Sequence, residues 1–351
     1  MRACREQLVV LTLGLGITGC GRLGFSSTAA TSGDGTGPTV DAQTLLTDSG
    51  TLATASCIGL ANTCGPSQNE SCCGSPLVPG GTFYRSFDVA GDGMFGANTY
   101  PATVSAFRLD TYEVTVGRFR KFVEAGLGTQ ANPPNAGDGA HPLVGGSGWS
   151  SSWNQYLDAD TPTMTADLVC DATHATWTAT AGANENLPMN CIMWYEAFAF
   201  CAWDGGFLPT EAEWNYAAAG GTDQRAYPWS SPAGSLGIGC NDANYDPSAG
   251  TYCVGTTGGL MPVGSTSPQG DGKWGQADLA GSVWEKVLDS YVDPYAFTTC
   301  DDCADLSTVD ARTVRGGAWN ADEDSARTGY RYYDPPDERY EEMGVRCARV
   351  P

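Results

Sequence analysis

The cysteines are the residues whose types and spacing could most directly do chemistry. Cys300-Asp-Asp-Cys303 has the spacing of a redox pair or of half a zinc site. A redox thiol needs a lowered pKa, from a helix N-terminus or nearby cations, whereas Asp301, Asp302 and Asp305 would raise it. A zinc site would need a second cysteine pair or histidines, and neither is evident. The sequence therefore predicts a structural disulfide at this position.

The cysteine count predicts an extensive disulfide framework. Fourteen cysteines, less Cys4 and Cys20 near the N-terminus, leave twelve, an even number that is typical of an exported chain with six disulfides. Four are expected to close on one another, with no bond between the adjacent two: Cys57, Cys64, Cys72 and Cys73. Local spacing also favours three further pairs: Cys240 with Cys253, Cys300 with Cys303 and, more weakly, Cys170 with Cys191.

Histidine and charge content exclude several classes of function. The chain has two histidines, His141 and His174, so a metal site built on three histidines is excluded and a histidine-based triad is disfavoured. Both histidines lie in polar segments without an evident partner, and we expect them at the surface. A net charge of −22 argues against nucleic acid, which is itself a polyanion, and favours cations or cationic partners.

The N-terminus predicts an address at the cell envelope. Arg2 and Arg5 precede the apolar stretch Leu8–Ile17, which is too short to span a bilayer and fits a signal sequence. The residues up to Cys20 look like a bacterial lipobox, so residues 1–19 are predicted to be a signal peptide and Cys20 to be lipidated. The alternative is an ordinary secretory signal. Gly21, by resemblance to Gram-negative lipoproteins, indicates the outer membrane.

Composition divides the rest of the chain into three parts. Residues 20–56, rich in Gly, Ser, Thr, Ala and Asp, predict a flexible tether. Residues 57–76 form a cysteine-rich segment, and residues 77–351 are expected to form one domain. Regular elements should be short beyond the third predicted helix, because Gly, Pro and Asn clusters interrupt the chain.

Four regular elements are predicted within that domain. Residues 104–110 alternate and predict a strand, whereas residues 115–126 and 194–203 carry the patterns of helices. A third helix begins after Thr210, which can form a capping box with Glu213, and ends at Gly220-Gly221. Thr210 and Glu213 also look catalytic as a motif, but the cap is the favoured interpretation. Glu211 could instead anchor a neighbouring loop.

Five motifs together resemble the formylglycine-generating enzyme (sulfatase-modifying factor) family. They span nearly all of residues 77–351, in the family's order: Tyr112–Thr115, Cys201–Trp214, Asp278–Glu285, Arg315–Trp319 and Gly344–Ala348. The resemblance implies an irregular, loop-rich α+β fold with low regular content, akin to the C-type-lectin fold. It also implies a long-range disulfide between Cys201 and Cys347.

The same resemblance raises doubt about the family's chemistry. Its enzymes oxidise a sulfatase cysteine to formylglycine, using oxygen and copper held by two cysteines that follow the Arg-Gly-Gly motif. Here Ala321 and Ala326 lie about where that pair would fall. The acidic residues between them are hard oxygen donors, which do not replace thiolates for Cu(I). We therefore expect no copper, and the substitutions Phe207, Ser282 and Lys286 put the inherited substrate groove in doubt.

Calcium is the cofactor that the resemblance leaves in place. The family holds Ca²⁺ partly on the loop that corresponds to residues 278–285. Here Asp278 and Glu285 can offer carboxylates and Gly281 and Val283 backbone carbonyls, which are the hard oxygens that Ca²⁺ prefers. The alternative is a solvated acidic turn. A second family site implies a ligand near Asn244-Tyr245.

A second acidic group lies near the C-terminus. It is predicted to be a solvated face, with a cation or partner site as the alternative, and consists of Asp334, Asp337, Glu338, Glu341 and Glu342.

Three functions remain open from the sequence. The favoured one is a non-catalytic module on the cell envelope that binds an envelope protein, a peptide or a glycan. The second is an enzyme, either the formylglycine-generating oxidase or a related metal-dependent oxidation. The third is a purely structural envelope module.

Overall fold

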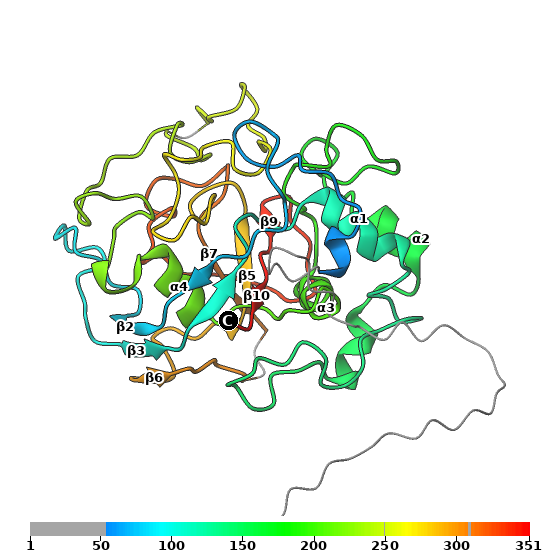
Figure 1. Ribbon diagram of the computed structural model, residues 1–351, viewed down its shortest axis with the longest axis horizontal. Helices are drawn as coiled ribbons and strands as arrows, with labels where there is room; N and C mark the ends of the chain where they lie inside the picture. The colour runs from blue at the N-terminus through cyan, green and yellow to red at the C-terminus, as the bar shows by residue number, and fades with distance from the viewer. Residues whose placement is uncertain (1–53, 249, 308–309) are drawn as a thin grey trace, which may run out of the picture. The chain divides into compact units, whose positions relative to one another are not determined.

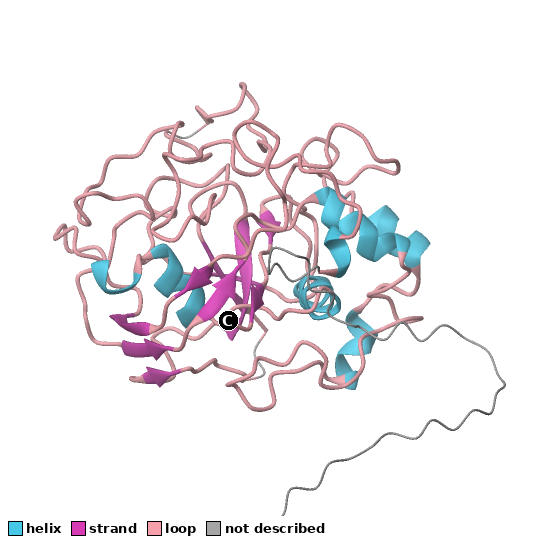
Figure 2. Ribbon diagram, viewed as in Figure 1, coloured by secondary structure: helices cyan, strands magenta, loops and turns pink. Residues whose placement is uncertain are grey.

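The computed structural model describes residues 54–351, except 249 and 308–309. The predicted signal peptide, the lipidation site Cys20 and most of the predicted tether lie outside the described residues. Figures 1 and 2 show that loops and turns make up most of the described chain, with short strands and helices between them. Within the described part of the chain, no helix is long and apolar enough to cross a membrane. This arrangement confirms the loop-rich α+β fold with little regular structure.

The described strands form three small sheets. One has the order β1-β4-β10, another β2-β3-β6, and the largest β8-β7-β5-β9. The first sheet contains β1 (Leu77–Val78), β4 (Phe107–Leu109) and β10 (Ala348–Arg349). The second contains β2 (Gly81–Tyr84), β3 (Pro101–Val104) and β6 (Cys300–Asp301). The third contains β5 (Trp284–Ser290), β7 (Arg312–Arg315), β8 (Tyr332–Asp334) and β9 (Met343–Gly344). Each sheet joins segments that are far apart in the sequence.

The predicted strand over residues 104–110 is wrong as a single element. The chain instead forms β3 and β4, which belong to different sheets, and it bends between them. At the bend, the backbone N–H and the hydroxyl of Ser105 both donate to the carboxylate of Asp302, at 2.6 Å each. The alternating sequence of residues 104–110 is therefore split between two strands, at a point where Ser105 contacts a residue 197 positions away.

Three of the described helices follow the sequence pattern closely. Thr115 caps α1 (Val116–Glu124), and α3 (Trp194–Trp203) has the predicted bounds. Thr210 and Glu213 form the predicted capping box of α4 (Glu211–Ala218), and Gly220, just beyond that helix, is left-handed, with φ of 66°. The remaining helices are α2 (Thr161–Asp167) and the 3-10 turns η1 (Ala55–Cys57), η2 (Ser151–Tyr156) and η3 (Gly221–Asp223).

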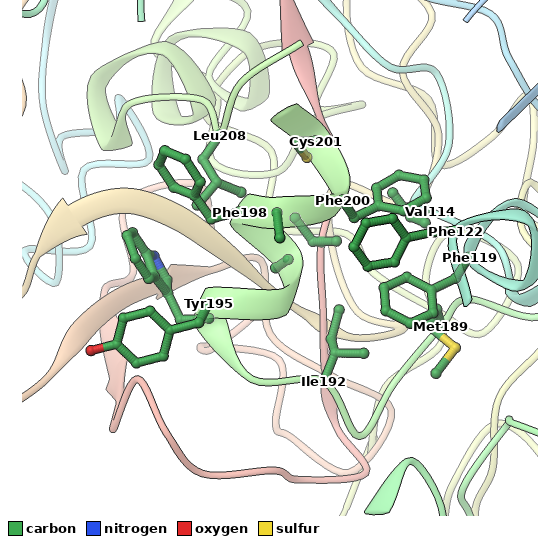
Figure 3. Close-up of a cluster of buried hydrophobic side chains, with 14 of the residues drawn as sticks. Val114, Phe119, Phe122, Met189, Ile192, Tyr195, Phe198, Phe200, Cys201 and Leu208 are labelled. Atoms are coloured by element: carbon green, nitrogen blue, oxygen red, sulfur yellow. The ribbon is translucent and has the colours of Figure 1, made fainter. Parts of the chain in front are cut away.

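Aromatic side chains fill the largest core cluster, which surrounds α3. Eight of the ten residues of α3 are buried, so this helix is apolar on all sides, as expected of a helix enclosed by the fold. Phe200 packs against Phe119 and Phe122 of α1, with ring centroids 5.5 and 5.8 Å apart (Figure 3). Cys201 lies in the same cluster, so the long-range disulfide begins in the core.

The disulfide predictions are confirmed. Cys201 bonds to Cys347 across 146 residues, and the three local pairs form as expected. In the cysteine-rich segment, Cys57 bonds to Cys73 and Cys64 to Cys72. All twelve cysteines of the described residues are therefore in disulfides.

The N-terminal boundary of the folded part lies earlier than the composition indicates. Ser56, the last residue of the predicted tether, is fully buried, and its backbone N–H donates to Asp204 at 2.7 Å. Its hydroxyl accepts a hydrogen bond from Arg118, which also pairs with Asp110 and Asp204. The cysteine-rich segment packs on the domain as well, because Tyr112 donates to Glu70 at 2.7 Å.

Candidate functional site

A buried cluster of three carboxylates and one arginine occupies the predicted calcium loop. Glu285 lies on β5 and Asp278 in the loop before it, whereas Glu113 precedes α1 and Arg346 follows β9. All four residues are at most 9% exposed. The cluster thus joins three separate motifs of the sequence.

Arg346 takes up the charge of Glu285. Its Nη2 and Nε lie 2.6 and 2.7 Å from the two carboxylate oxygens, and Trp214 donates its indole N–H to the same carboxylate at 2.7 Å. Arg346 also donates to the backbone carbonyls of Asp110, Thr111 and Ala277. Both oxygens of Glu285 therefore already face donors.

Glu113 and Asp278 are less well supplied with donors. Burial, with the neighbouring carboxylates, raises the pKa of Glu113 well above its usual value. Its Oε2 has no hydrogen-bond partner among the described residues, and the hydrogen bond from the Val283 N–H to its Oε1 is long, at 3.4 Å. Burial also raises the pKa of Asp278 to about 6, although Gly264 N–H donates to it at 2.5 Å. A buried carboxylate oxygen without a donor fits a bound cation.

Sequence reasoning did not select Glu113. In the sequence, Glu113 stands out only as part of the Tyr112–Thr115 motif. That motif indicates membership of the family, but it does not indicate that Glu113 binds a metal. The contact with the loop at 278–285 spans 170 residues, from Glu113 to Val283. No local pattern could reveal it.

The two loops predicted to hold calcium lie side by side. Asn244 and Gly281 form an isolated β-bridge, and the Ser282 N–H donates to the Asn244 carbonyl at 2.8 Å. Gly281 has φ of 77°, and a Cβ there would fall 2.3 Å from the Asn244 carbonyl oxygen, so a glycine is required. The side-chain amide of Asn244 donates to Gly259, and Tyr245 is buried in an adjoining cluster. The structure brings the predicted ligand residues into one region, and calcium binding stays a prediction.

The segment after Arg315 forms a closed loop without thiols. Ala326 is 1% exposed and lies in a core cluster with Tyr227 and Tyr245, whereas Ala321 is partly buried and packs against the cluster that contains Trp284. Asp322, one of the intervening acids, accepts two hydrogen bonds from Ser325.

Glu211 anchors neighbouring segments, as one interpretation of the sequence indicated. Its carboxylate lies 2.6 Å from Arg331 Nε and 3.2 Å from Arg315 Nε. Burial alone would raise the pKa of Glu211, but the positive charges of Arg331 and Arg315 lower it by more, so the pKa lies below its usual value. Asp289 accepts the Glu211 backbone N–H at 2.7 Å, and burial together with the Glu211 charge raises the pKa of Asp289 to about 7.

The expectation that both histidines lie at the surface without partners is wrong. His141 is 4% exposed, and its Nε2 lies 2.9 Å from Glu213 Oε1, because the capping box uses the other oxygen of Glu213. His174 is partly buried, lies 3.3 Å from Asp171 and packs against the ring of Trp319, with centroids 4.5 Å apart.

The acidic group near the C-terminus is only in part a solvated face. Asp334 is 1% exposed and forms an ion pair with Lys286, one of the substituted positions. Asp337 and Glu338 are exposed, whereas Glu341 and Glu342 are partly buried. Phe207, another substituted position, lies in the core and pairs its backbone with Ala348.

Fold and motifs together define a loop-rich domain of the formylglycine-generating-enzyme type. The chain belongs to the family described as the sulfatase-modifying factor enzyme 1-like domain, which matches residues 61–351.

Two relatives illustrate the range of the family. The chain is 30% identical to a formylglycine-generating enzyme of Thermomonospora curvata, over 81% of this chain and 96% of the relative. It is 28% identical to the inactive C-alpha-formylglycine-generating enzyme 2 of Mus musculus, over 77% of this chain and 84% of the relative. The family therefore includes both active and inactive members.

A solved structure shares the fold. PvdO from Pseudomonas aeruginosa matches with a TM-score of 0.52 and 19% identity, over 78% of this chain and 93% of that chain. At this identity the likeness concerns the fold alone.

Proposed function

We propose that this chain is a non-catalytic binding module of the family. A lipid on Cys20 would anchor it to the cell envelope, which in a Gram-negative bacterium means the outer membrane. The observation that carries the proposal is the thiol content. Cu(I) requires soft donors, and by the resemblance Ala321 and Ala326 lie about where the copper-binding cysteines would fall. The twelve cysteines of the described chain are paired in disulfides, and a cystine sulfur is not a thiolate.

An exposed aromatic surface supports a binding role. Tyr332 and Tyr333 of β8 are 41% and 48% exposed, although they lie on a strand that pairs with β7. Their rings stack on each other at 5.1 Å, and the Tyr332 ring also stacks on Trp284 at 5.4 Å. Tyr291 lies 5.2 Å from Tyr333. Rigid aromatic faces offer large contact areas at low entropic cost, so this tyrosine surface fits a peptide, a glycan or an envelope protein.

Calcium would act here as a structural ion. Glu113 and Asp278 would hold it, together with carbonyl oxygens of the loop at 278–285, because Glu285 is already paired with Arg346. The orphaned Glu113 oxygen supports this assignment. A cation would neutralise two buried carboxylates and fix the loop against α1.

The decisive experiment for catalysis uses a sulfatase-motif peptide. The purified domain, supplied with copper and reductant, is incubated with the peptide, and the formylglycine enzyme of Thermomonospora curvata serves as the positive control. We expect no aldehyde by mass spectrometry above the no-enzyme level. Product formation would refute the non-catalytic assignment and favour the oxidase. Its loss in Cys300→Ser would then place the active thiols at Cys300 and Cys303.

The tyrosine surface is tested by binding. Peptide and glycan arrays are probed with the wild-type domain, with a Tyr332→Ala/Tyr333→Ala variant, and with Tyr84→Ala as a control of comparable exposure. We expect the double variant to lose ligands that the control retains. Equal binding by all three proteins would exclude this surface as the ligand site.

The anchor is tested in cells of a Gram-negative host. Labelled fatty acid should be incorporated into the wild type and not into Cys20→Ser, and the variant should leave the membrane fraction. Equal membrane association of the two proteins, with no label in the wild type, would show that the address is wrong.

A further inference from the structure

We propose a binding site for a divalent first-row transition ion, of the Zn²⁺ class, formed by Asp171, His174 and Glu341. One donor atom from each residue lies within 4.8 Å of the other two. The ligands come from two segments separated by more than 160 residues of chain. This site is distinct from the calcium cluster and does not depend on the proposed binding function.

The donor geometry fits a metal of this size. His174 Nδ1 lies 3.3 Å from Asp171 Oδ1. Bonds of about 2.0–2.2 Å to zinc, at tetrahedral or octahedral angles, separate neighbouring ligand atoms by about 3–3.5 Å. The imidazole and the carboxylate are therefore already spaced as two ligands of one ion.

The surroundings of His174 direct its other nitrogen away from the site. Nε2 lies 3.3 Å from the carbonyl oxygen of Thr257, which can only accept a hydrogen bond. With the proton on Nε2, the Nδ1 lone pair faces the carboxylate of Asp171 at 3.3 Å, an arrangement that a metal ion bound by both atoms would satisfy. Protein metal sites commonly fix the histidine tautomer through a backbone carbonyl in this way.

The two segments are held together from outside the site. Asn190 is fully buried, and its amide donates to the carbonyls of His174 and Glu341, at 2.9 and 2.6 Å. The disulfide between Cys170 and Cys191 adjoins both Asp171 and Asn190. These contacts position the ligand-bearing backbones before any metal arrives, which lowers the entropic cost of binding.

The ligand set selects the class of ion. One imidazole and two carboxylates suit Zn²⁺ or Mn²⁺, whereas Cu(I) prefers sulfur and Ca²⁺ takes six to eight oxygens. The backbone N–H groups of His174 and Thr173 donate to Asp171 Oδ1, at 2.6 and 2.8 Å, and hold this carboxylate beside the imidazole. Three protein ligands leave the remaining coordination positions to water, and the His174 side chain is 17% exposed.

The experiment is calorimetric titration of the chelator-stripped domain with Zn²⁺, in saturating calcium so that the other cluster does not compete. We expect one equivalent to bind the wild type. His174→Ala, Asp171→Asn and Glu341→Gln should each weaken the affinity by at least about tenfold, the effect of losing even an outer-shell contact. Glu338→Gln, an exposed carboxylate three residues before Glu341, is the matched control and should bind as the wild type does.

A second measurement on the wild type avoids variants that fail to fold. The chain has two histidines and His141 is buried, so zinc should perturb the imidazole resonances of His174 in NMR spectra and leave those of His141 unchanged. Failure of the wild type to take up one equivalent, or zinc binding that leaves the His174 signals unmoved, would overturn the proposal. The contact between His174 and Asp171 would then be a local side-chain contact without a metal.

Discussion

Replacing Arg346 with methionine tests whether its buried ion pair with Glu285 holds the loop at 278–285 in place. Arg346 is fully buried, pairs with both oxygens of Glu285 and donates to three backbone carbonyls. Methionine keeps an apolar chain of similar length but removes the charge and every donor. Glu285 would then join Glu113 and Asp278 as a third buried carboxylate without a cation.

The expected loss is large compared with the stability of a typical domain. Removing one partner of a buried ion pair costs about 3–5 kcal/mol, because the other charge is left uncompensated. Domains are stable by about 5–15 kcal/mol, so a third or more of the total could be lost. With about 2–4 °C per kcal/mol, the melting temperature should fall by roughly 10 °C.

The assay is thermal and denaturant unfolding of three variants under chelated conditions. Arg108→Met is the matched control, because Arg108 is partly exposed and donates to a single carbonyl, that of Ser75. We expect it to cost less than about 1 kcal/mol. Adding Glu285→Gln to Arg346→Met should restore stability, since it removes the unpaired charge and keeps an acceptor for Trp214.

Two results would refute this reasoning. If Arg346→Met is no less stable than Arg108→Met, the buried pair does not hold the region. If the double variant is no more stable than Arg346→Met alone, the loss comes from packing and not from the uncompensated charge.

Three further predictions concern stability. Calcium should stabilise the chelated domain by about 2.7 kcal/mol at a hundredfold excess over Kd. Glu113→Gln should abolish that gain and exposed Glu124→Gln should not, so an unchanged melting temperature on adding calcium would contradict the site. Burial raises the pKa of Asp289 to about 7, so the folded protein holds this proton more tightly than the unfolded chain does. The stability that the protonated carboxyl contributes is therefore fully present below about pH 4 and lost by about pH 7. Asp289→Asn should flatten this part of the measured pH profile, and an identical profile would show that another group titrates. Cys201→Ser/Cys347→Ser should lose about 5 kcal/mol in denaturant unfolding, from the chain entropy of a loop closed across 146 residues; a loss under 1 kcal/mol would argue against that account.

Elements with local signals could be predicted from the sequence. The capping box of α4 lies within four residues, so Thr210 and Glu213 identify the start of the helix without knowledge of the fold. The same holds for the disulfide between Cys240 and Cys253, which closes a short loop. The bond between Cys201 and Cys347 instead rested on the resemblance, since nothing local joins residues 146 apart.

Features that depend on distant contacts could not be predicted. His141 lies in a polar loop, and its partner Glu213 is 72 residues away, so its burial has no local signal. Residues 104–110 alternate as one strand would, yet the chain bends at Ser105, where Asp302 accepts two hydrogen bonds. Glu113 and Arg346 were in recognised motifs, but their charges meet only in the folded chain.

Three residues that the resemblance marks as departures from the family are accommodated in the fold. Lys286 forms an ion pair with Asp334 in the interior, and Phe207 packs in the core and pairs its backbone with Ala348. Ala326 fills its place against two tyrosines with almost no exposure. Each of these three side chains is therefore accommodated by packing or by pairing. An alanine at position 326 is thus physically compatible with this framework, which is the condition that the proposed binding module has to meet.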